Sequence, residues 1–300
     1  MLFPLAALSV LHTGAVMRLG ELYPKDTPEF TIAHLPLGVS YAAALLGILL
    51  THEFGHYFAA RIRGVPASLP YFLPMPLSPF GTWGAIIGMP ERITSRRALL
   101  EIGAAGPLAG LCVALPLLAY GLHLSPVKPL EPGSLMEGQC LLYLLMKRLV
   151  VGPIPAGHDV FLHPVAFAGW AGLFVTMINL LPYGQLDGGH VAYALLGPRQ
   201  NRIGRWVRWA TLPVFAYNLI SQLAPVLRRG FDRDAVSLAV SNSAFWLVWF
   251  GMLSLMARVS GPDHPPTDPG EALGPVRTVV AVLCLVLFVL LFMPSPLVVS

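Results

Sequence analysis

Three ionisable side chains fall within five residues of the otherwise apolar stretch 48–60, ILLTHEFGHYFAA. In a helix, His52 and His56 lie one turn apart on the same face, so both imidazoles can be directed at one metal ion. The pattern HExxH also places Glu53 where it can accept a proton from a metal-bound water molecule. Ionisable groups inside membrane helices are costly and usually functional. We therefore favour a metal site over the alternative, two buried histidines that are satisfied by their neighbours.

A third ligand is expected, because a catalytic zinc usually has three protein ligands and one open position for water. The candidate is Asp187, which follows a helix-breaking proline and glycine in the stretch 177–197, MINLLPYGQLDGGHVAYALLG. The alternative role for Asp187 is the N-cap of a helix that starts at Gly188. His190 could compete as a ligand, but we interpret it as a supporting residue, because two histidines and an aspartate already complete a catalytic set.

Membrane helices must position these residues. The 300-residue chain is 55% hydrophobic and 11% charged, whereas a soluble domain carries about 25% charged residues. These charges are too few to cover a surface exposed to water. The formal net charge of +4 includes no basic stripe of the kind that would indicate a nucleic-acid partner. We therefore predict a polytopic membrane protein that contacts the lipid bilayer and no nucleic acid.

Seven stretches approach the roughly 20 apolar residues that a helix needs to cross a bilayer core. They centre near 2–18, 35–60, 98–122, 164–182, 209–226, 243–259 and 276–293. The first is the weakest, because it is short and contains His12. The predicted fold class is all-α, with about six to seven transmembrane helices. The stretch 140–152 is apolar but too short to span, and it is better explained as a helix lying at the membrane surface.

One stretch between the predicted spans is neither helix-like nor loop-like. Residues 64–91, GVPASLPYFLPMPLSPFGTWGAIIGMPE, are too apolar for a solvated loop and too rich in proline and glycine for a helix. Irregular backbone at membrane depth is tolerated only where protein or a wet cavity covers it. We therefore predict a short re-entrant β-hairpin or loop near the cytoplasmic face, with strand-like content in TWGAIIGM at 82–89.

The arginines indicate an orientation in the membrane. Four clusters share one side if the second, fourth and sixth predicted spans run from outside to inside: Arg61 and Arg63; Arg92, Arg96 and Arg97; Arg199, Arg202, Arg205 and Arg208; and Arg258. By the positive-inside rule this side is the cytoplasm. The bias is imperfect, since other basic residues fall on the opposite side, namely Lys147, Arg148, Arg228, Arg229 and Arg233. We expect an integral, multi-pass protein of the bacterial inner (plasma) membrane with its active site toward the cytoplasm.

Several motifs together carry a family resemblance. HEFGH at 52–56 and NLLPYGQLDGG at 179–189 resemble the motif pair of the site-2 protease family, the intramembrane zinc metalloproteases of peptidase family M50. GAAGPLAG at 103–110 is similar to the small-residue motif of that family's middle core helix, and GTWGA at 81–85 is similar to the glycine-rich segment before it. The resemblance covers about residues 35–200 and implies a three-helix catalytic core. Its helices correspond to the stretches 35–60, 98–122 and 164–182.

The resemblance also implies roles for individual residues. The cofactor would be Zn2+, held by His52, His56 and Asp187, and Glu53 would be the general base. Asn179 would help to stabilise the oxyanion of the tetrahedral intermediate, although an interhelical hydrogen bond explains this residue equally well. The glycines at positions 103, 106 and 110 are sufficiently explained by close helix packing.

The implied activity is the hydrolysis of peptide bonds in or near transmembrane segments of other membrane proteins, as in regulated intramembrane proteolysis. Such substrates include membrane-tethered regulators. A substrate helix must unwind before it is cut, and the strand-like segment could accept the unwound stretch by β-augmentation. The predicted substrate-binding residues are Gly81, Thr82, Trp83, Gly84, Ala85 and Ile86.

Two other functions could use the same residues. A membrane metal transporter could pass a metal through the His/His/Asp site, but transporters often contain internal repeats, and none is visible here. An inactive scaffold would bind membrane proteins without cutting them, but the intact HExxH and Asp187 argue against it. We predict three regions: an N-terminal transmembrane helix and outside loop at 1–34, the catalytic membrane core with the metal site at 35–200, and C-terminal transmembrane helices at 201–300.

Overall fold

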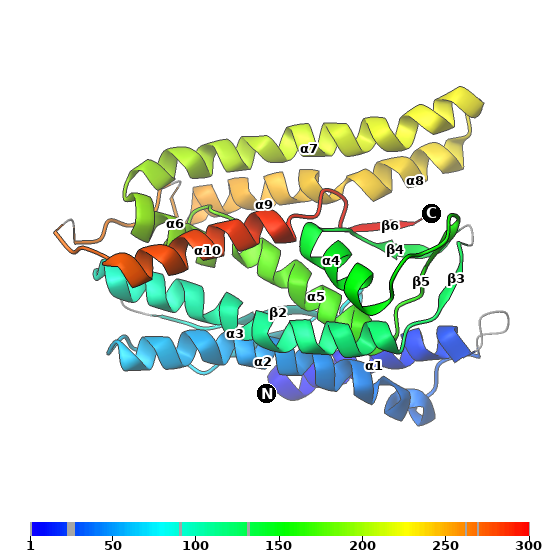
Figure 1. Ribbon diagram of the computed structural model, residues 1–300, viewed down its shortest axis with the longest axis horizontal. Helices are drawn as coiled ribbons and strands as arrows, with labels where there is room; N and C mark the ends of the chain where they lie inside the picture. The colour runs from blue at the N-terminus through cyan, green and yellow to red at the C-terminus, as the bar shows by residue number, and fades with distance from the viewer. Residues whose placement is uncertain are drawn as a thin grey trace. The chain divides into compact units, whose positions relative to one another are not determined.

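The computed structural model is mostly helical. It describes residues 2–22, 28–89, 92–130, 133–261, 263–268 and 270–299. These ranges contain ten α-helices, labelled in Figure 1, and short two-stranded sheets. The chain divides into two compact units. The first comprises Met1–Ile93, Ala104–Pro129 and Leu145–Thr176, and the second comprises Thr94–Gly103, Leu130–Leu144 and Met177–Ser300.

Within the described ranges, four helical segments are long and apolar enough to cross a membrane. They are Leu2–Leu22, Ile32–Ile62, Arg96–His123 and Arg199–Arg228. A fifth span results if the pair Arg233–Ser243 and Phe245–Val259, which is bent by 42°, counts as one. Pro164–Asn179 and Pro275–Leu291 are apolar but shorter. The chain is therefore a mostly helical polytopic membrane protein, and the count of about six to seven spans stays a prediction.

In the first unit, the N-terminal helix packs closely against the element that leads into the histidine helix. These elements are α1 (Leu2–Leu22), the 3-10 helix η1 (Ile32–Gly38) and α2 (Val39–Ile62). A Cβ at Gly14 of α1 would lie 2.7 Å from Cβ of Tyr41, and a Cβ at Gly38 would overlap the carbonyl of Leu11. Such glycine contacts are typical of helices that pack inside membranes. They fix α2 along one side.

Two short strands of the first unit, β1 (Tyr71–Pro74) and β2 (Thr82–Ile86), form an antiparallel pair. Tyr71 pairs with Ile86 and Phe72 with Ala85. The turn between them is fastened to both neighbouring helices, because the hydroxyl of Ser9 donates to the carbonyl of Gly81 (2.6 Å) and that of Tyr41 to the carbonyl of Phe80 (3.2 Å). The sequence predicts strand-like content here, and whether the pair enters the membrane stays a prediction.

Helices α3 (Arg96–His123) and α5 (Pro164–Asn179) contribute most of their length to the first unit, where they meet α2. A Cβ at Gly169 of α5 would lie 2.7 Å from Cα of Leu118 in α3. A Cβ at Gly172 would lie 2.9 Å from Cβ of Ala114 in α3 and 3.0 Å from Ile48 in α2. The three helices that correspond to the predicted core stretches therefore contact one another here.

The segment between α3 and α5 contains α4 (Leu141–Val150) and the antiparallel pair of β3 (Val127–Pro129) and β5 (His158–Val160). Within the first unit, Nζ of Lys147 lies 2.7 Å from Oδ1 of Asp159, and Lys147 is buried. The opposite face of α4 exposes Leu145 and Leu149. The position of α4 at the membrane surface stays a prediction.

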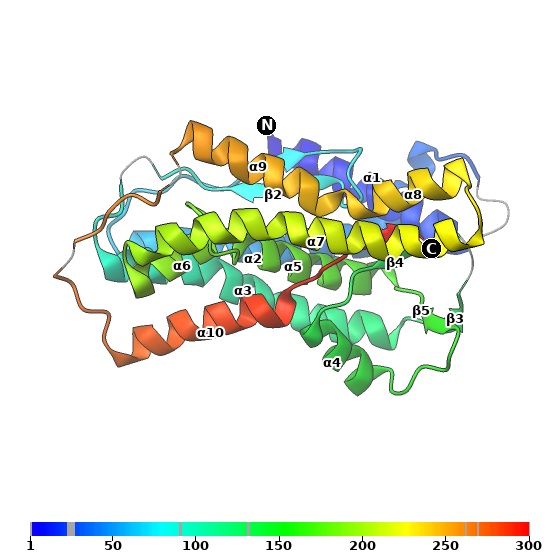
Figure 2. The same cartoon turned by 90° about the horizontal axis from the view of Figure 1, so that it is seen from above.

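The second unit holds the C-terminal helices, which are α6 (Asp187–Leu196), α7 (Arg199–Arg229), α8 (Arg233–Ser243), α9 (Phe245–Val259) and α10 (Pro275–Leu291). α7 runs beside α8 and α9, and α6 contacts α7 and α10 (Figures 1 and 2). The strand β4 (Leu135–Glu137) pairs with β6 (Leu297–Val299) near the C-terminus. The hydroxyl of Tyr183 donates to the carbonyl of Leu253 (2.7 Å), which ties the segment before α6 to α9.

The helix order predicts which ends share one side of the membrane. Ile62, at the end of α2, and Arg202, early in α7, should lie on the same side, because α3 and α5 are each predicted to cross once between them. Single cysteines at these two positions should react with a membrane-impermeant thiol reagent from one side only. A cysteine at the exposed Leu124, just after α3, should react only from the other side.

The labelling requires a background in which the native Cys112, Cys140 and Cys284 are replaced by alanine. Reaction at positions 62 and 202 from opposite sides would show that α5, the shorter apolar helix, does not cross the membrane.

Candidate metal centre

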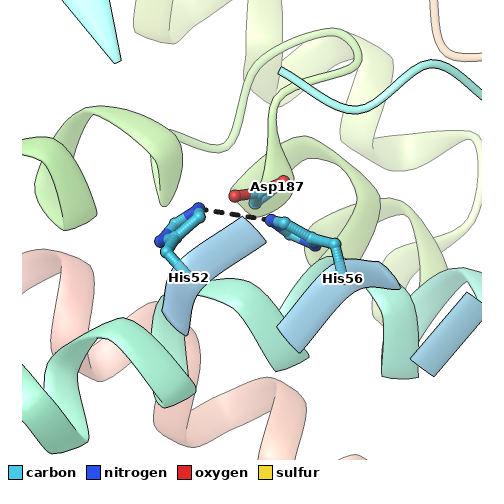
Figure 3. Close-up of side chains that lie close together, drawn as sticks. All are labelled: His52, His56 and Asp187. Carbon is cyan, nitrogen blue, oxygen red and sulfur yellow. Dashed lines mark hydrogen bonds between the residues drawn. The ribbon is translucent and has the colours of Figure 1, made fainter. Parts of the chain in front are cut away.

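The histidine pair lies on one face of α2, as the spacing predicts. His52, Glu53 and His56 are 2%, 7% and 7% exposed, in a helix that is otherwise apolar. Nε2 of His52 lies 3.2 Å from Nε2 of His56 (Figure 3). Ligand atoms of a tetrahedral zinc, each about 2.0–2.1 Å from the metal, are about 3.3 Å apart. The two imidazole nitrogens therefore already have the separation that a shared metal requires.

Two glycines of α3, in the same unit, make room for these rings. A Cβ at Gly106 would overlap the imidazole of His56, and a Cβ at Gly110 would lie 3.1 Å from Cβ of His52. The two glycines are four residues apart, as are the two histidines, so the facing helices match turn for turn. Sequence analysis explains these glycines by helix packing alone and misses this relation. The equal spacing of the two motifs is the signal that could have found it.

Asp187 begins a helix of the second unit. α6 starts at Asp187 and its N-cap is Leu186, so the alternative role of Asp187 as the N-cap is wrong. The break that separates α5 from α6 contains Gly184 at φ +52°, a left-handed conformation that glycine adopts without strain. A Cβ at Gly188 would overlap the carbonyl of Leu180, so only glycine permits this tight return of the chain.

Among the described residues, His52, His56 and Asp187 form the group that could hold a metal ion. Each offers one ligand atom, and these atoms all lie within 4.8 Å of one another (Figure 3). Two imidazoles and one carboxylate are a donor set of catalytic zinc sites, which leave a fourth position open. The donor chemistry and the spacing of the three residues therefore fit the implied metal.

Asn179 and His190 are the other polar residues that the sequence places near the metal centre. Asn179 is the last residue of α5, and its role in stabilising an oxyanion stays a prediction. His190 lies one turn after Asp187, and its Nδ1 is 2.8 Å from Nε2 of His264. This contact agrees with its interpretation as a supporting residue. Sequence analysis missed His264, which lies 74 residues away in a proline-rich segment without a local motif.

The predicted substrate-binding residues divide into two kinds. Gly81 packs against α1, since a Cβ there would lie 2.8 Å from Cα of Val10. Thr82 is buried, and its hydroxyl donates to the carbonyl of Leu73 (2.8 Å), so its side chain serves the turn. Trp83 and Ile86 are 71% and 58% exposed, whereas Ala85 is half-buried, and no described atom lies within 4 Å of a Cβ placed at Gly84. The role of this stretch in substrate binding stays a prediction.

The helical membrane fold, the HExxH pair and the nearby aspartate together are typical of membrane-bound metallopeptidases. A family model described as "Peptidase family M50" matches residues 40–214. This match covers more than half of the 300 residues, and the chain belongs to this family, the site-2 protease family.

The chain is similar to several curated plant proteins. It is 36% identical over 182 residues to "Probable zinc metalloprotease EGY1, chloroplastic" of Arabidopsis thaliana, which is 59% of this chain and 31% of that protein. It is 30% identical over 217 residues to the protein of the same name in Oryza sativa subsp. japonica, which is 66% of this chain and 37% of that protein. It is 32% identical over 200 residues to "Probable zinc metalloprotease EGY2, chloroplastic" of Arabidopsis thaliana (65% and 35%).

In each case the matched region is about a third of the relative's length. No solved structure matches. Because these relatives are named as chloroplastic, they give no support to the predicted bacterial inner membrane.

The fit between Gly106 and His56 leads to a test of the metal centre. Gly106→Ala should weaken zinc binding by about ten-fold or more, as changes beside metal ligands commonly do, because the new methyl group displaces the ring. Gly47→Ala in α2 is the matched control, since no described atom lies within 4 Å of a Cβ there. Zinc affinity is measured by competition with a chelator, and circular dichroism reports the helix content. Wild-type affinity in Gly106→Ala would show that the glycine does not shape the site.

Proposed function

We propose that this protein is an intramembrane zinc metalloprotease that hydrolyses peptide bonds in or near transmembrane segments of other membrane proteins. One observation carries the proposal. The buried HExxH pair of α2 and Asp187 form a group that could hold a metal, in a chain of peptidase family M50. The similarity to relatives named as zinc metalloproteases supports Zn2+ as the cofactor and proteolysis as the activity.

The proposed ligands are His52, His56 and Asp187. When bound, zinc supplies a Lewis acid that lowers the pKa of a coordinated water to about 7 and polarises a carbonyl group. Glu53 follows His52 on α2, about 100° around the helix axis, so it lies beside the donor set and outside it. Its carboxylate would accept the proton of the attacking water and later deliver it to the leaving amine. Because Glu53 is 7% exposed, this transfer takes place away from bulk solvent.

Asn179 is the proposed oxyanion residue. It ends α5 immediately before the broken segment that leads to Asp187. Its amide N–H groups can donate to an oxygen that gains negative charge in the transition state, and such donors are most effective where water is excluded. A hydrogen bond between helices remains the competing role for this side chain.

We further propose that β2 holds the unwound substrate. In the described sheet, β2 pairs with β1 along one edge. A substrate that unwinds at membrane depth frees N–H and C=O groups, each of which costs several kcal/mol if left without a partner. A backbone edge supplies partners whatever the substrate sequence. The open surroundings of Gly84 and the exposed Trp83 and Ile86 support this role.

We propose that the protein is integral to the membrane and that its metal site lies near one membrane face. His56 lies six residues before Ile62, the end of α2, which corresponds to about 9 Å along the helix. Arg61 and Arg63 flank that end, so the proposed site lies toward the arginine-rich face, the cytoplasmic one if the positive-inside rule applies. A bacterial inner membrane remains part of the proposal on this argument alone. The substrates proposed are transmembrane proteins such as membrane-tethered regulators.

The metal-transporter alternative is not favoured. The family match is to peptidases, and a transit site would leave Glu53 without a task. A transporter would move zinc across a vesicle membrane at a rate that does not depend on Glu53.

Glu53→Gln should separate catalysis from metal binding. Glutamine has nearly the same shape but cannot accept the proton, so cleavage should fall by at least about 100-fold while zinc content stays at the wild-type value. The measurement uses purified protein in lipid nanodiscs with a model transmembrane substrate, followed by gel analysis, and mass spectrometry for zinc. Asp187→Ala is the companion variant and should lose both zinc and cleavage. Near-wild-type cleavage by Glu53→Gln would mean that another group activates the water.

Proline substitutions should test the substrate strand. β2 ends at Ile86, and Ile87 follows it directly. Neighbouring residues of an extended segment direct their N–H groups to opposite edges, so Ile86→Pro and Ile87→Pro would each remove the donor of one edge. At least one of them should reduce turnover sharply with intact zinc content, whereas alanine at either position should have little effect. Unchanged cleavage in both proline variants would show that this segment is a packed loop without a role in substrate binding.

A further inference from the structure

The first turn of α6 has no capping side chain of its own. Leu186 occupies the N-cap and makes no side-chain cap hydrogen bond, and Asp187 is the first helical residue. Most helices fix this end with a serine, threonine, aspartate or asparagine at the N-cap. Contacts made elsewhere on α6 therefore help to fix the orientation of Asp187 about the helix axis.

One such contact joins His190 to His264, both in the second unit. His190 is three residues after Asp187 and therefore lies on the same side of α6. Its Nδ1 is 2.8 Å from Nε2 of His264, and Nδ1 of His264 is 2.7 Å from the carbonyl of Pro265. A carbonyl only accepts, so Nδ1 of His264 carries a proton. In a neutral His264 ring Nε2 is then the acceptor, and Nδ1 of His190 donates the proton in the contact between the rings.

His264 is held rigidly enough to act as an anchor. Its ring stacks on Tyr193 of α6, with centroids 4.2 Å apart and planes at 18°. Its backbone N–H donates to Oδ1 of Asn201 at the start of α7 (2.9 Å). His264 as a whole is 5% exposed. The anchor thus contacts α6 at two positions, residues 190 and 193, and is itself fixed by α7.

The linker between α9 and α10 that carries His264 is also fastened at its other end. The N–H of Asp268 donates to the carbonyl of Thr94 (2.9 Å). The carboxylate of Glu271 accepts from the hydroxyl of Ser95 (2.9 Å) and from the N–H of Arg97 (3.1 Å). Desolvation would raise the pKa of Glu271, but these hydrogen bonds outweigh it and lower the pKa. The ionised carboxylate also suits the positive N-terminal end of α3.

The start of α3 in turn holds α6. The guanidinium of Arg96 donates to the carbonyls of Ala194 and Leu195, in the last turn of α6. A Cβ at Gly103 would lie 2.9 Å from Cβ of His190 and 3.2 Å from the carbonyl of Asp187. α6 is therefore held at its last turn by Arg96, and at its first turn by Gly103 on one side and by the histidine contact.

We propose that His264 is a positioning residue for Asp187, acting through His190 and Tyr193. The proposal rests on the proposed zinc site. The side chains of a helix reach about 5–6 Å from its axis, so a rotation of about 10° moves the carboxylate of Asp187 by about 1 Å. Metal–ligand distances tolerate only about 0.2 Å. A linker that prevents this small rotation therefore determines how tightly the centre holds its metal.

The test compares three variants of the full-length protein in nanodiscs. His264→Phe keeps a ring to stack on Tyr193 but removes the acceptor, whereas His264→Gln keeps an acceptor oxygen. Asp263→Asn changes the neighbouring exposed residue, which pairs with Arg205, and serves as the control. Zinc affinity is measured by competition with a fluorescent chelator. The unfolding temperature of the zinc-free protein reports any general loss of stability.

We expect His264→Phe to bind zinc about ten-fold more weakly, and His264→Gln and Asp263→Asn to stay near wild type. Wild-type affinity in His264→Phe would overturn the positioning role. An equal loss of affinity in His264→Phe and His264→Gln would also overturn it, because the hydrogen bond would then not matter. Asp187→Ala tests the proposed zinc site separately from the positioning role of His264. Full zinc retention in that variant would overturn the zinc site and, with it, the positioning role.

Discussion

Burying ionisable groups inside apolar helices is the constraint on which the rest of the structure depends. His52, Glu53 and His56 are all less than a tenth exposed on a helix of otherwise apolar composition. Such groups are expensive at this depth unless they pair or bind a cation. A bound metal would supply that partner, and Gly106 and Gly110 leave the space that the two rings need. The proposed ligand pair and the glycines that face it therefore belong together, which explains why both pairs are spaced four residues apart.

Asp187 is placed by a break in the chain, unlike Glu53, which lies within the continuous helix α2. The chain ends α5, makes a short irregular segment and starts α6. Irregular backbone inside a membrane protein requires internal partners. They are present, since the N–H of Tyr183 donates to the carbonyl of Leu181 (2.7 Å) and that of Leu186 to the carbonyl of Tyr183 (3.1 Å).

A structural feature of this chain was predictable from the sequence when neighbouring residues cause it, and was not predictable when distant residues cause it. The convergence of His52 and His56 follows from helix geometry alone, and the spacing was sufficient. The limits of α7 were less predictable: hydropathy detects 209–226, whereas the helix begins at Arg199, because an arginine-rich first part is helical without being apolar. The bend between α8 and α9 has no strong breaker in the sequence. His264 was not predictable at all, since its role depends on a partner 74 residues away and not on its neighbours.

The contacts that hold α6, the helix of Asp187, link the predicted catalytic region to the C-terminal region. The motifs that carry the proposed metal ligands fall between residues 52 and 187, and the family match ends at residue 214. Yet the segment before α6 is tied to Leu253, and α6 itself to His264. The first part of α3, which belongs to the second unit, is tied to α10, since Nε of Arg277 lies 2.7 Å from Oε1 of Glu101. The C-terminal helices, which sequence analysis treats as a separate region, therefore take part in holding the third proposed ligand. A site whose ligands lie far apart in the chain must draw its rigidity from whichever elements pack around each ligand. For Asp187 those elements include the start of α3 as well as helices that follow it in the sequence.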